Sequence, residues 1–152
     1  MNYLDQITIY PLKKEDISLF KKLIYLFEDV FIMENFDIPN DPHLENLLNK
    51  NDFHAIVAIH NNEIVGGLTA YTLQQYYSIK PLAYIFDLAV AVQFQRQNVG
   101  TQLINYSKEY FKEIGYEEVF VQADKVDDYA VKFYRKTKPT VEEDVSHFYY
   151  VL

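Results

Sequence analysis

The residues best placed to do chemistry lie in a polar loop between a strand-like run and a helix-like run. The strand-like run YIFDLAVAV ends at about residue 92, and helical periodicity begins near residues 98–100. The first turn of a helix has unpaired N–H groups and a partial positive charge, so successive amides at such a corner can hold a diphosphate. Arg96 adds a cationic side chain to this loop. The sequence predicts an anion site here, and the same corner also fits an ordinary helix start without a ligand.

Charge and composition narrow the classes of partner. The chain has 152 residues, 22 of them acidic and 14 basic, which gives a formal net charge of -8. A surplus of negative charge without any Lys/Arg run repels phosphate backbones, so we expect no nucleic acid partner. There is no Cys, and the four His residues stand apart at positions 43, 54, 60 and 147. We therefore expect neither a disulfide framework nor a metal site.

The length fits one domain spanning residues 1–152. Asp5 interrupts the stretch that a signal peptide would need to be apolar, and no window approaches 18 apolar residues. We expect a cytoplasmic protein that does not bind a membrane.

Hydrophobic periodicity predicts helices and strands in an α/β (α+β) order. Asp41 is the expected N-cap of the second helix, with Pro42 at its first position, and Asn61 and Asn62 form the expected hairpin turn. The expected elements are strand 7–12, helices 16–31 and 42–48, strands 53–60, 63–73 and 81–90, helix 96–114, strand 118–123, helix 128–136 and strand 146–152. Three consecutive strands can form an antiparallel meander, and the later crossover requires parallel pairing. The pattern predicts a mixed central sheet with helices on both faces.

Two motifs in this order resemble the GNAT superfamily of N-acetyltransferases. The sextet Gln95-Arg96-Gln97-Asn98-Val99-Gly100 is similar to its acyl-CoA loop, which reads Gln or Arg, two free residues, Gly, one free residue, then Gly or Ala. Asn98 stands where that pattern has Gly, and Asn tolerates the left-handed conformation better than other side chains do. The second block, residues 127–136, resembles the superfamily's later motif, although residues 137–139 depart from the Leu-Gly-Phe that usually follows.

Residues 53–149 further resemble the small, type I aminoglycoside 3-N-acetyltransferases, most specifically at residues 121–128. This resemblance implies a GNAT-like fold and transfer of acetyl from acetyl-CoA to the 3-amino group of a deoxystreptamine antibiotic, by direct attack. An amine attacks a thioester only as the free base. The implied base is Asp87, with His147 or a water as the alternative, and the implied acid for the leaving thiolate is Tyr134. Asp87 also fits a solvated strand acid, and His147 a structural hydrogen-bonding group.

The resemblance also implies which residues hold the two substrates. The backbone of residues 88–90 would pair with the pantetheine amides and donate an N–H to the thioester oxygen. The expected coenzyme-binding residues are Leu88, Ala89, Val90, Gln95, Arg96, Gln97, Asn98, Val99, Gly100, Thr101 and Asp127. A cationic acceptor should meet acidic side chains, and the expected ones are Asp87, Asp124, Asp128 and Glu143. The acidic run at residues 142–144 equally fits a solvated surface.

Three activities remain open from the sequence. The first is an aminoglycoside acetyltransferase, the second a GNAT enzyme for a polyamine or a lysine amine, and the third a non-catalytic acyl-CoA-binding or protein-interaction domain. A homodimer is also expected, since the resemblance implies one and the C-terminal aromatic run could take part in it.

Overall fold

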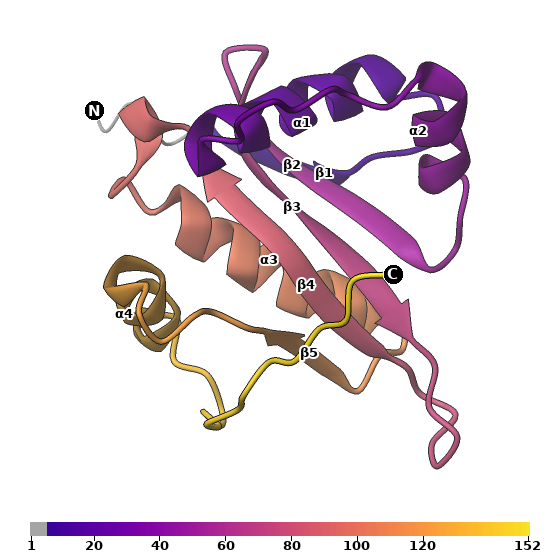
Figure 1. Ribbon diagram of the computed structural model, residues 1–152, viewed down its shortest axis with the longest axis vertical. Coiled ribbons are helices and arrows are strands. Elements are labelled where there is room, and N and C mark those ends of the chain that lie inside the picture. The colour runs from indigo at the N-terminus through magenta and orange to yellow at the C-terminus, as the bar shows by residue number, and fades with distance from the viewer. Residues whose placement is uncertain (1–5) are drawn as a thin grey trace. The chain divides into compact units, whose positions relative to one another are not determined.

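A computed structural model describes residues 6–152 of the chain, which divides into two compact units, Met1–Gln122 and Ala123–Leu152 (Figure 1). Within the described residues, the first unit holds a five-stranded sheet and helices α1 to α3, and the second holds helix α4.

The sheet is mixed, as the periodicity predicts. Its order is β1 (Thr8–Pro11), β2 (Phe53–His60), β3 (Glu63–Leu73), β4 (Leu82–Val90) and β5 (Glu118–Val121). The first four strands pair antiparallel, and β5 runs parallel to β4. Parallel neighbours need a crossover, which helix α3 (Val99–Glu113) provides. The β2–β3 turn uses two left-handed residues, Asn61 at φ 49° and Asn62 at φ 64°.

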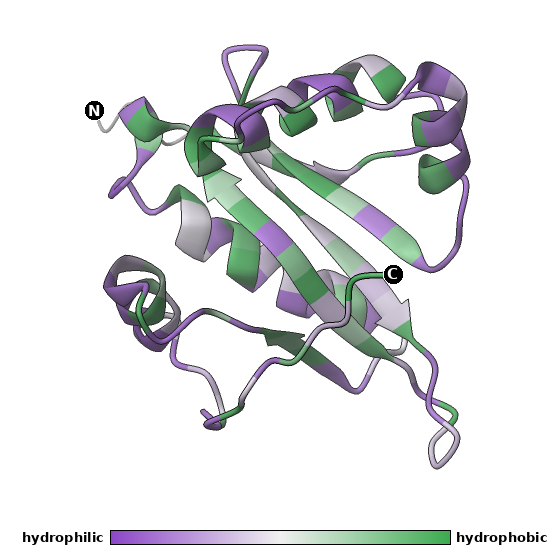
Figure 2. Ribbon diagram, in the orientation of Figure 1, coloured by the Kyte–Doolittle hydropathy of each residue, from purple (hydrophilic) through white to green (hydrophobic). Residues whose placement is uncertain are grey.

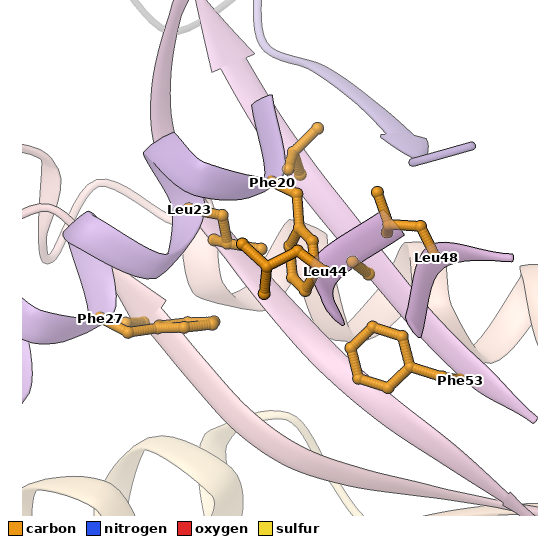
Figure 3. Close-up of a cluster of buried hydrophobic side chains, with 9 residues drawn as sticks. Phe20, Leu23, Phe27, Leu44, Leu48 and Phe53 are labelled. Carbon is orange, nitrogen blue, oxygen red and sulfur yellow. The ribbon is translucent and has the colours of Figure 1, made fainter. Parts of the chain in front are cut away.

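Helices cover both faces of the sheet, with α1 (Ile17–Phe31) and α2 (Asp41–Leu48) on one face and α3 on the other (Figure 1). The stripe of α1 buries side chains at helical spacing, and these meet α2 and the start of β2 (Figure 3). The buried cluster is Phe20, Leu23, Phe27, Leu44, Leu48, Phe53, Ala55, Val57 and Ala89. This packing fixes the sheet from which the polar loop between β4 and α3 leads.

Gly67 on β3 sets how closely α1 approaches the sheet. A Cβ at this position would lie 2.5 Å from Leu23 Cδ1 and 2.8 Å from the Ile56 carbonyl oxygen. No side chain fits at these distances, because non-bonded carbon contacts prefer about 3.5 to 4.0 Å. Its neighbour Gly66 faces the other way, where a Cβ would meet Leu103 of α3 at 3.3 Å.

The second unit contains α4 (Asp128–Lys136), whose N-cap is Asp127. The Asp127 carboxylate accepts a hydrogen bond from the Ala130 N–H at 3.0 Å. Residues 139–152 follow without regular secondary structure.

Two expectations from the sequence are wrong. The N-cap of α2 is Asn40, whose side chain accepts from the His43 N–H at 3.0 Å, and Asp41 is the first helical residue. Both residue types cap well and Pro tolerates the first turn, so the pattern fits either register. The expected strand at 146–152 is absent, because β-rich composition forms a strand only where an edge pairs with it.

A search of the described residues finds no helix with the length and apolarity needed to cross a membrane.

Candidate active site

Strand β4 has an unpaired edge toward its C-terminal end. Its parallel ladder with β5 runs from the pair Leu82–Glu118 to the pair Ile85–Val121 and stops there, whereas pairing with β3 continues to Val90 (Figure 1). Among the described strands, none therefore pairs with the outer edge of residues 86–90. This stretch includes Leu88, Ala89 and Val90, and backbone groups there that no strand engages can pair with an extended ligand as an added strand would.

Asp87 lies beside a β-bulge in this strand. Thr69 pairs with Asp87 and Ala70 pairs with Ile85, so Phe86 is the extra residue. The Asp87 side chain is half-buried, and burial raises the pKa of its carboxyl above the ordinary value. Figure 2 shows β4 as hydrophobic along most of its length, with a hydrophilic band between. Asp87 is thus a partly desolvated acid within the sheet.

The loop after β4 ends in a left-handed residue that starts helix α3. Asn98 is the N-cap at φ 70° and ψ 7°, and its side chain makes no capping hydrogen bond. The Gln102 N–H donates to the Asn98 carbonyl oxygen at 3.0 Å, so the amides of residues 98–101 precede the helical ladder. Val99 and Gly100 are buried and fix this turn against the sheet. Asn98 thus adopts the conformation that a Gly in the motif would favour.

Two glutamine side chains hold the loop in place. Gln95 Nε2 donates to the Val90 carbonyl oxygen at 3.0 Å, and Gln97 Nε2 donates to the Gln93 carbonyl oxygen at 2.9 Å. Arg96 is exposed and also has positive φ, at 59°. The Gln95 bond ties the loop to the end of β4. The structure therefore brings Asp87, residues 88–90 and residues 95–101 into one region of the first unit, and Thr101 completes the first turn of α3.

The remaining expected site residues belong to the second unit. Asp127 caps α4, and Asp128 forms an exposed ion pair with Lys132 at 3.4 Å. Asp124 is exposed, and its carbonyl oxygen accepts from the Asp127 N–H at 2.9 Å. Tyr134 is half-buried, with its ring centroid 4.9 Å from that of Phe133. The loop before α4 and the helix itself thus carry most of the second motif.

Ion pairs engage two members of the acidic run at residues 142–144. Glu142 accepts from Arg135 Nη2 at 2.7 Å, and Asp144 pairs with Lys125 Nζ at 2.8 Å. Both contacts are exposed, and the guanidinium lowers the pKa of Glu142. Glu143 is exposed and is the member of the run without an ion pair among those the structure describes.

Sequence reasoning missed the aromatic residues around Asp87. Burial raises the pKa of Tyr71, and the negative charge of Asp87 raises it further. Phe86 packs edge-on against Tyr71, with ring centroids 5.7 Å apart. Regular strand alternation would place Phe86 and Asp87 on opposite faces of the sheet. Because Phe86 is the extra residue of the bulge, both side chains lie near Tyr71. An aromatic residue next to an acid inside a strand is the signal that could have drawn attention to this place.

Known proteins are similar to this chain in sequence and in fold. Residues 20–137 match the acetyltransferase (GNAT) family. The chain is 57% identical to the aminoglycoside acetyltransferase meta-AAC0020 from an uncultured soil metagenomic sample, solved in complex with sisomicin; the match covers 96% of each chain with a TM-score of 0.95. The aminoglycoside acetyltransferase HMB0005, also from an uncultured soil metagenomic sample, is 33% identical over 97% of this chain and 99% of its own, with a TM-score of 0.90.

A more distant structure shares the fold. AAC(6')-Iy, solved with the bisubstrate analog CoA-S-monomethyl-acetylneamine, is 16% identical over 97% of this chain and 100% of its own, with a TM-score of 0.77. No curated protein matches the chain significantly. The family match over residues 20–137, together with the 57% identical structure, establishes that this chain belongs to the acetyltransferase (GNAT) family and is an acetyl-transferring enzyme.

Proposed function

We propose that this enzyme transfers the acetyl group of acetyl-CoA to the 3-amino group of an aminoglycoside. The observation that carries the proposal is the 57% identity, over 96% of both chains, to an aminoglycoside acetyltransferase solved with sisomicin. The 3-position rests on the resemblance of residues 121–128 to the type I 3-N-acetyltransferases.

The coenzyme would lie along β4 and the start of α3. Amides of residues 98–101 precede the helical ladder and can donate to the diphosphate, where the helix dipole favours negative charge. Arg96 adds an exposed cation in the same loop, and the unpaired edge of residues 86–90 offers main-chain partners to the pantetheine amides. Bound acetyl-CoA supplies an activated acyl group as its thioester. Asp127, the N-cap of α4, would also contact the coenzyme. This role is supported by its position in the motif at residues 127–136.

Asp87 would accept the proton that the acceptor ammonium must lose. Its raised pKa makes it a stronger base than an ordinary carboxylate, which favours proton transfer near neutral pH. Asp87 would take the first proton, directly or by way of a water, and the free amine nitrogen then forms a bond to the acyl carbon. The carbon–sulfur bond breaks with its electron pair on sulfur, the thiolate takes a proton from the acid, and the second proton of the amine nitrogen restores that acid. An N–H of residues 88–90 would stabilise the charge that develops on the acyl oxygen.

Acidic side chains would recognise the several ammonium groups of the acceptor. Asp87 lies in the first unit, and Asp124, Asp128 and Glu143 lie in the second. All three acids of the second unit are exposed, so they can attract cations by long-range steering that salt weakens. The negative net charge of -8 acts in the same direction.

Tyr134 would protonate the departing thiolate, a role supported by its position in the motif at residues 127–136. We expect Tyr134→Phe to lower kcat by about 10-fold or more while leaving the affinity for CoA unchanged, because only the hydroxyl is removed. Stopped-flow or steady-state kinetics measure kcat, and calorimetric titration measures the affinity for CoA. Equal kcat values in the two proteins would remove Tyr134 as the acid.

The direct test is thiol release from acetyl-CoA with a panel of sisomicin, spermidine and a lysine peptide. We expect release with sisomicin and a product acetylated at the 3-amino group, as located by NMR. Acetylation at another amine would correct the position and keep the activity. Release with spermidine or the peptide alone would favour a different acceptor class, and no release with any of them would overturn the proposal.

A further inference from the structure

A row of aromatic rings crosses the sheet next to Asp87. Tyr71 on β3 meets Phe86 on β4 edge-on at 5.7 Å between ring centroids, and Phe86 meets Tyr84 edge-on at 6.0 Å. Tyr84 stacks on Phe120 of β5 at 4.7 Å with 8° between the ring planes. We call these four residues, Tyr71, Tyr84, Phe86 and Phe120, the aromatic platform. All four belong to the first unit, and three of its strands contribute to the platform.

The platform remains open to solvent in the middle of a folded sheet. Phe86 is 56% exposed and Tyr71 is 38% exposed, whereas their strand neighbours Ile85 and Ala70 are buried. The bulge explains the exposure of Phe86, because the residue has no opposite partner on β3. Leaving large apolar rings in water has a cost, so contiguous exposed rings commonly mark a binding surface.

The charges near the platform are suited to a cation. None of the five strands contains Lys or Arg. Asp87 follows Phe86 directly and acts electrostatically on Tyr71, so one carboxylate lies at the platform. An aromatic face carries negative potential and attracts ammonium groups, with the strongest effect where water is displaced. A ligand with ammonium groups on an apolar carbon ring fits both properties.

We infer that the aromatic platform is the surface on which the acceptor lies, with one apolar ring face of an amino sugar against Phe86 and Tyr71 and an ammonium group at Asp87. The inference rests on the proposed function and deepens it, because it assigns acceptor recognition to aromatic rings in addition to acidic side chains. The platform orients the amine beside the base, so its loss should affect acceptor KM more than kcat.

The test compares Phe86→Leu, which keeps apolar volume without a π-face, with Phe86→Trp, which keeps the face. Tyr76→Leu is the matched control, since Tyr76 is 98% exposed on the β3–β4 loop outside the platform. We expect Phe86→Leu to raise KM for sisomicin about five-fold, with kcat and KM for acetyl-CoA unchanged. Phe86→Trp should raise the KM for sisomicin less than Phe86→Leu does, because the indole keeps a π-face. Tyr76→Leu should stay close to wild type. A sisomicin KM in Phe86→Leu equal to that of the control, or an equal rise in both KM values, would overturn the inference.

A binding measurement separates this inference from the proposed function. The chain contains no Trp, so Phe86→Trp introduces a single indole at the platform. We expect sisomicin to change the indole emission in a saturable way, and Asp87→Asn in the same background to weaken the titration. This readout needs no turnover, so saturable binding without acetylation would refute the activity and keep the platform. An emission that stays constant up to millimolar sisomicin would refute the platform, even if the enzyme acetylates sisomicin.

Discussion

Asp87, the residue that we propose as the base, illustrates how a catalytic role would come at the expense of the fold. Its carboxyl is half-buried in β4, and burial raises its pKa. We expect Asp87→Asn to lower turnover by about 100-fold or more with little change in CoA affinity, because the amide cannot accept the proton. The acidic limb of the pH–rate profile should disappear with it. Glu63→Gln, at the exposed start of β3, is the matched control, and a wild-type pH profile in Asp87→Asn would exclude Asp87 as the base.

The same substitution should stabilise the protein. A raised carboxyl pKa in the folded state gives stability that is present below the unfolded pKa of about 3.9 and is lost as the pH rises through the folded value. At pH 7 the ionised Asp87 therefore destabilises the fold, and Asn, which stays neutral, does not. We expect a higher Tm for Asp87→Asn at pH 7 and a smaller difference at pH 4. A lower Tm at both pH values would contradict the sign.

At the scale of elements, the start of α3 depends on one left-handed residue. Asn98 has φ 70°, and a β-branched side chain in this conformation costs roughly 1 to 2 kcal/mol. We expect Asn98→Val to weaken CoA binding about 10-fold and Asn98→Gly to keep it or improve it, as measured by calorimetry. Asn35 has φ 52° in the loop between α1 and α2, so Asn35→Val provides a control with the same backbone strain. Equal CoA affinity in Asn98→Val and wild type would show that the corner does not hold the diphosphate.

Hydrophobic periodicity predicts helices and strands well where one face of the element is buried. It predicts them poorly where pairing with a neighbouring strand decides the structure. The stripe through Phe20, Leu23 and Phe27 predicts α1, and Asn61-Asn62 predicts the hairpin, because local geometry suffices for both. The bulge at Phe86 depends on the register between two strands, which no single run encodes. The aromatic run at 146–152 has β propensity but pairs with none of the described strands. The left-handed corner at Asn98 was therefore predictable, and the platform beside Asp87 was not.

On the scale of the whole molecule, His54 links stability to pH. It lies half-buried on β2, and its Nε2 is 2.9 Å from Thr72 Oγ1 and 3.3 Å from the Tyr116 hydroxyl. The ring also packs edge-on against Phe111 at 5.1 Å. Burial lowers the pKa of His54 and outweighs the opposite effect of the Asp52 charge.

A lowered histidine pKa makes the fold less stable in acid. At pH values between the pKa of His54 in the folded state and its unfolded pKa of about 6.5, the unfolded chain binds more protons than the folded chain. Stability therefore falls as the pH drops below about 6.5. We expect the Tm of the wild-type protein to decrease from pH 7.5 to pH 5.5. In His54→Gln, we expect the slope of Tm against pH to be flatter. His43→Gln, at an exposed histidine, should keep the wild-type slope. Parallel slopes in His54→Gln and wild type would exclude His54 as the source.

The C-terminal run leaves large apolar side chains exposed, and the dimer that the family resemblance implies could use them. Phe148 and Tyr150 are 81% and 87% exposed, and Val151 and Leu152 are exposed as well. We expect a homodimer, with light scattering giving twice the 18.0 kDa of one chain. The double substitution Phe148→Ser and Tyr150→Ser should give a monomer, and Tyr76→Ser, another exposed aromatic, should not. A wild-type monomer at micromolar concentration would refute the dimer.

Gly67 limits how far this enzyme can be reshaped by laboratory evolution. With no room for even a methyl group beside Leu23 and the Ile56 carbonyl oxygen, any other residue at position 67 forces the α1 side chain or the β2 backbone to shift. A mutational scan scored on resistance or turnover alone would mark Gly67 as intolerant and invite its assignment to the catalytic machinery. Pairing that scan with a measure of protein abundance would reveal the loss as a failure to accumulate folded enzyme, so libraries aimed at new acceptors should leave this codon fixed.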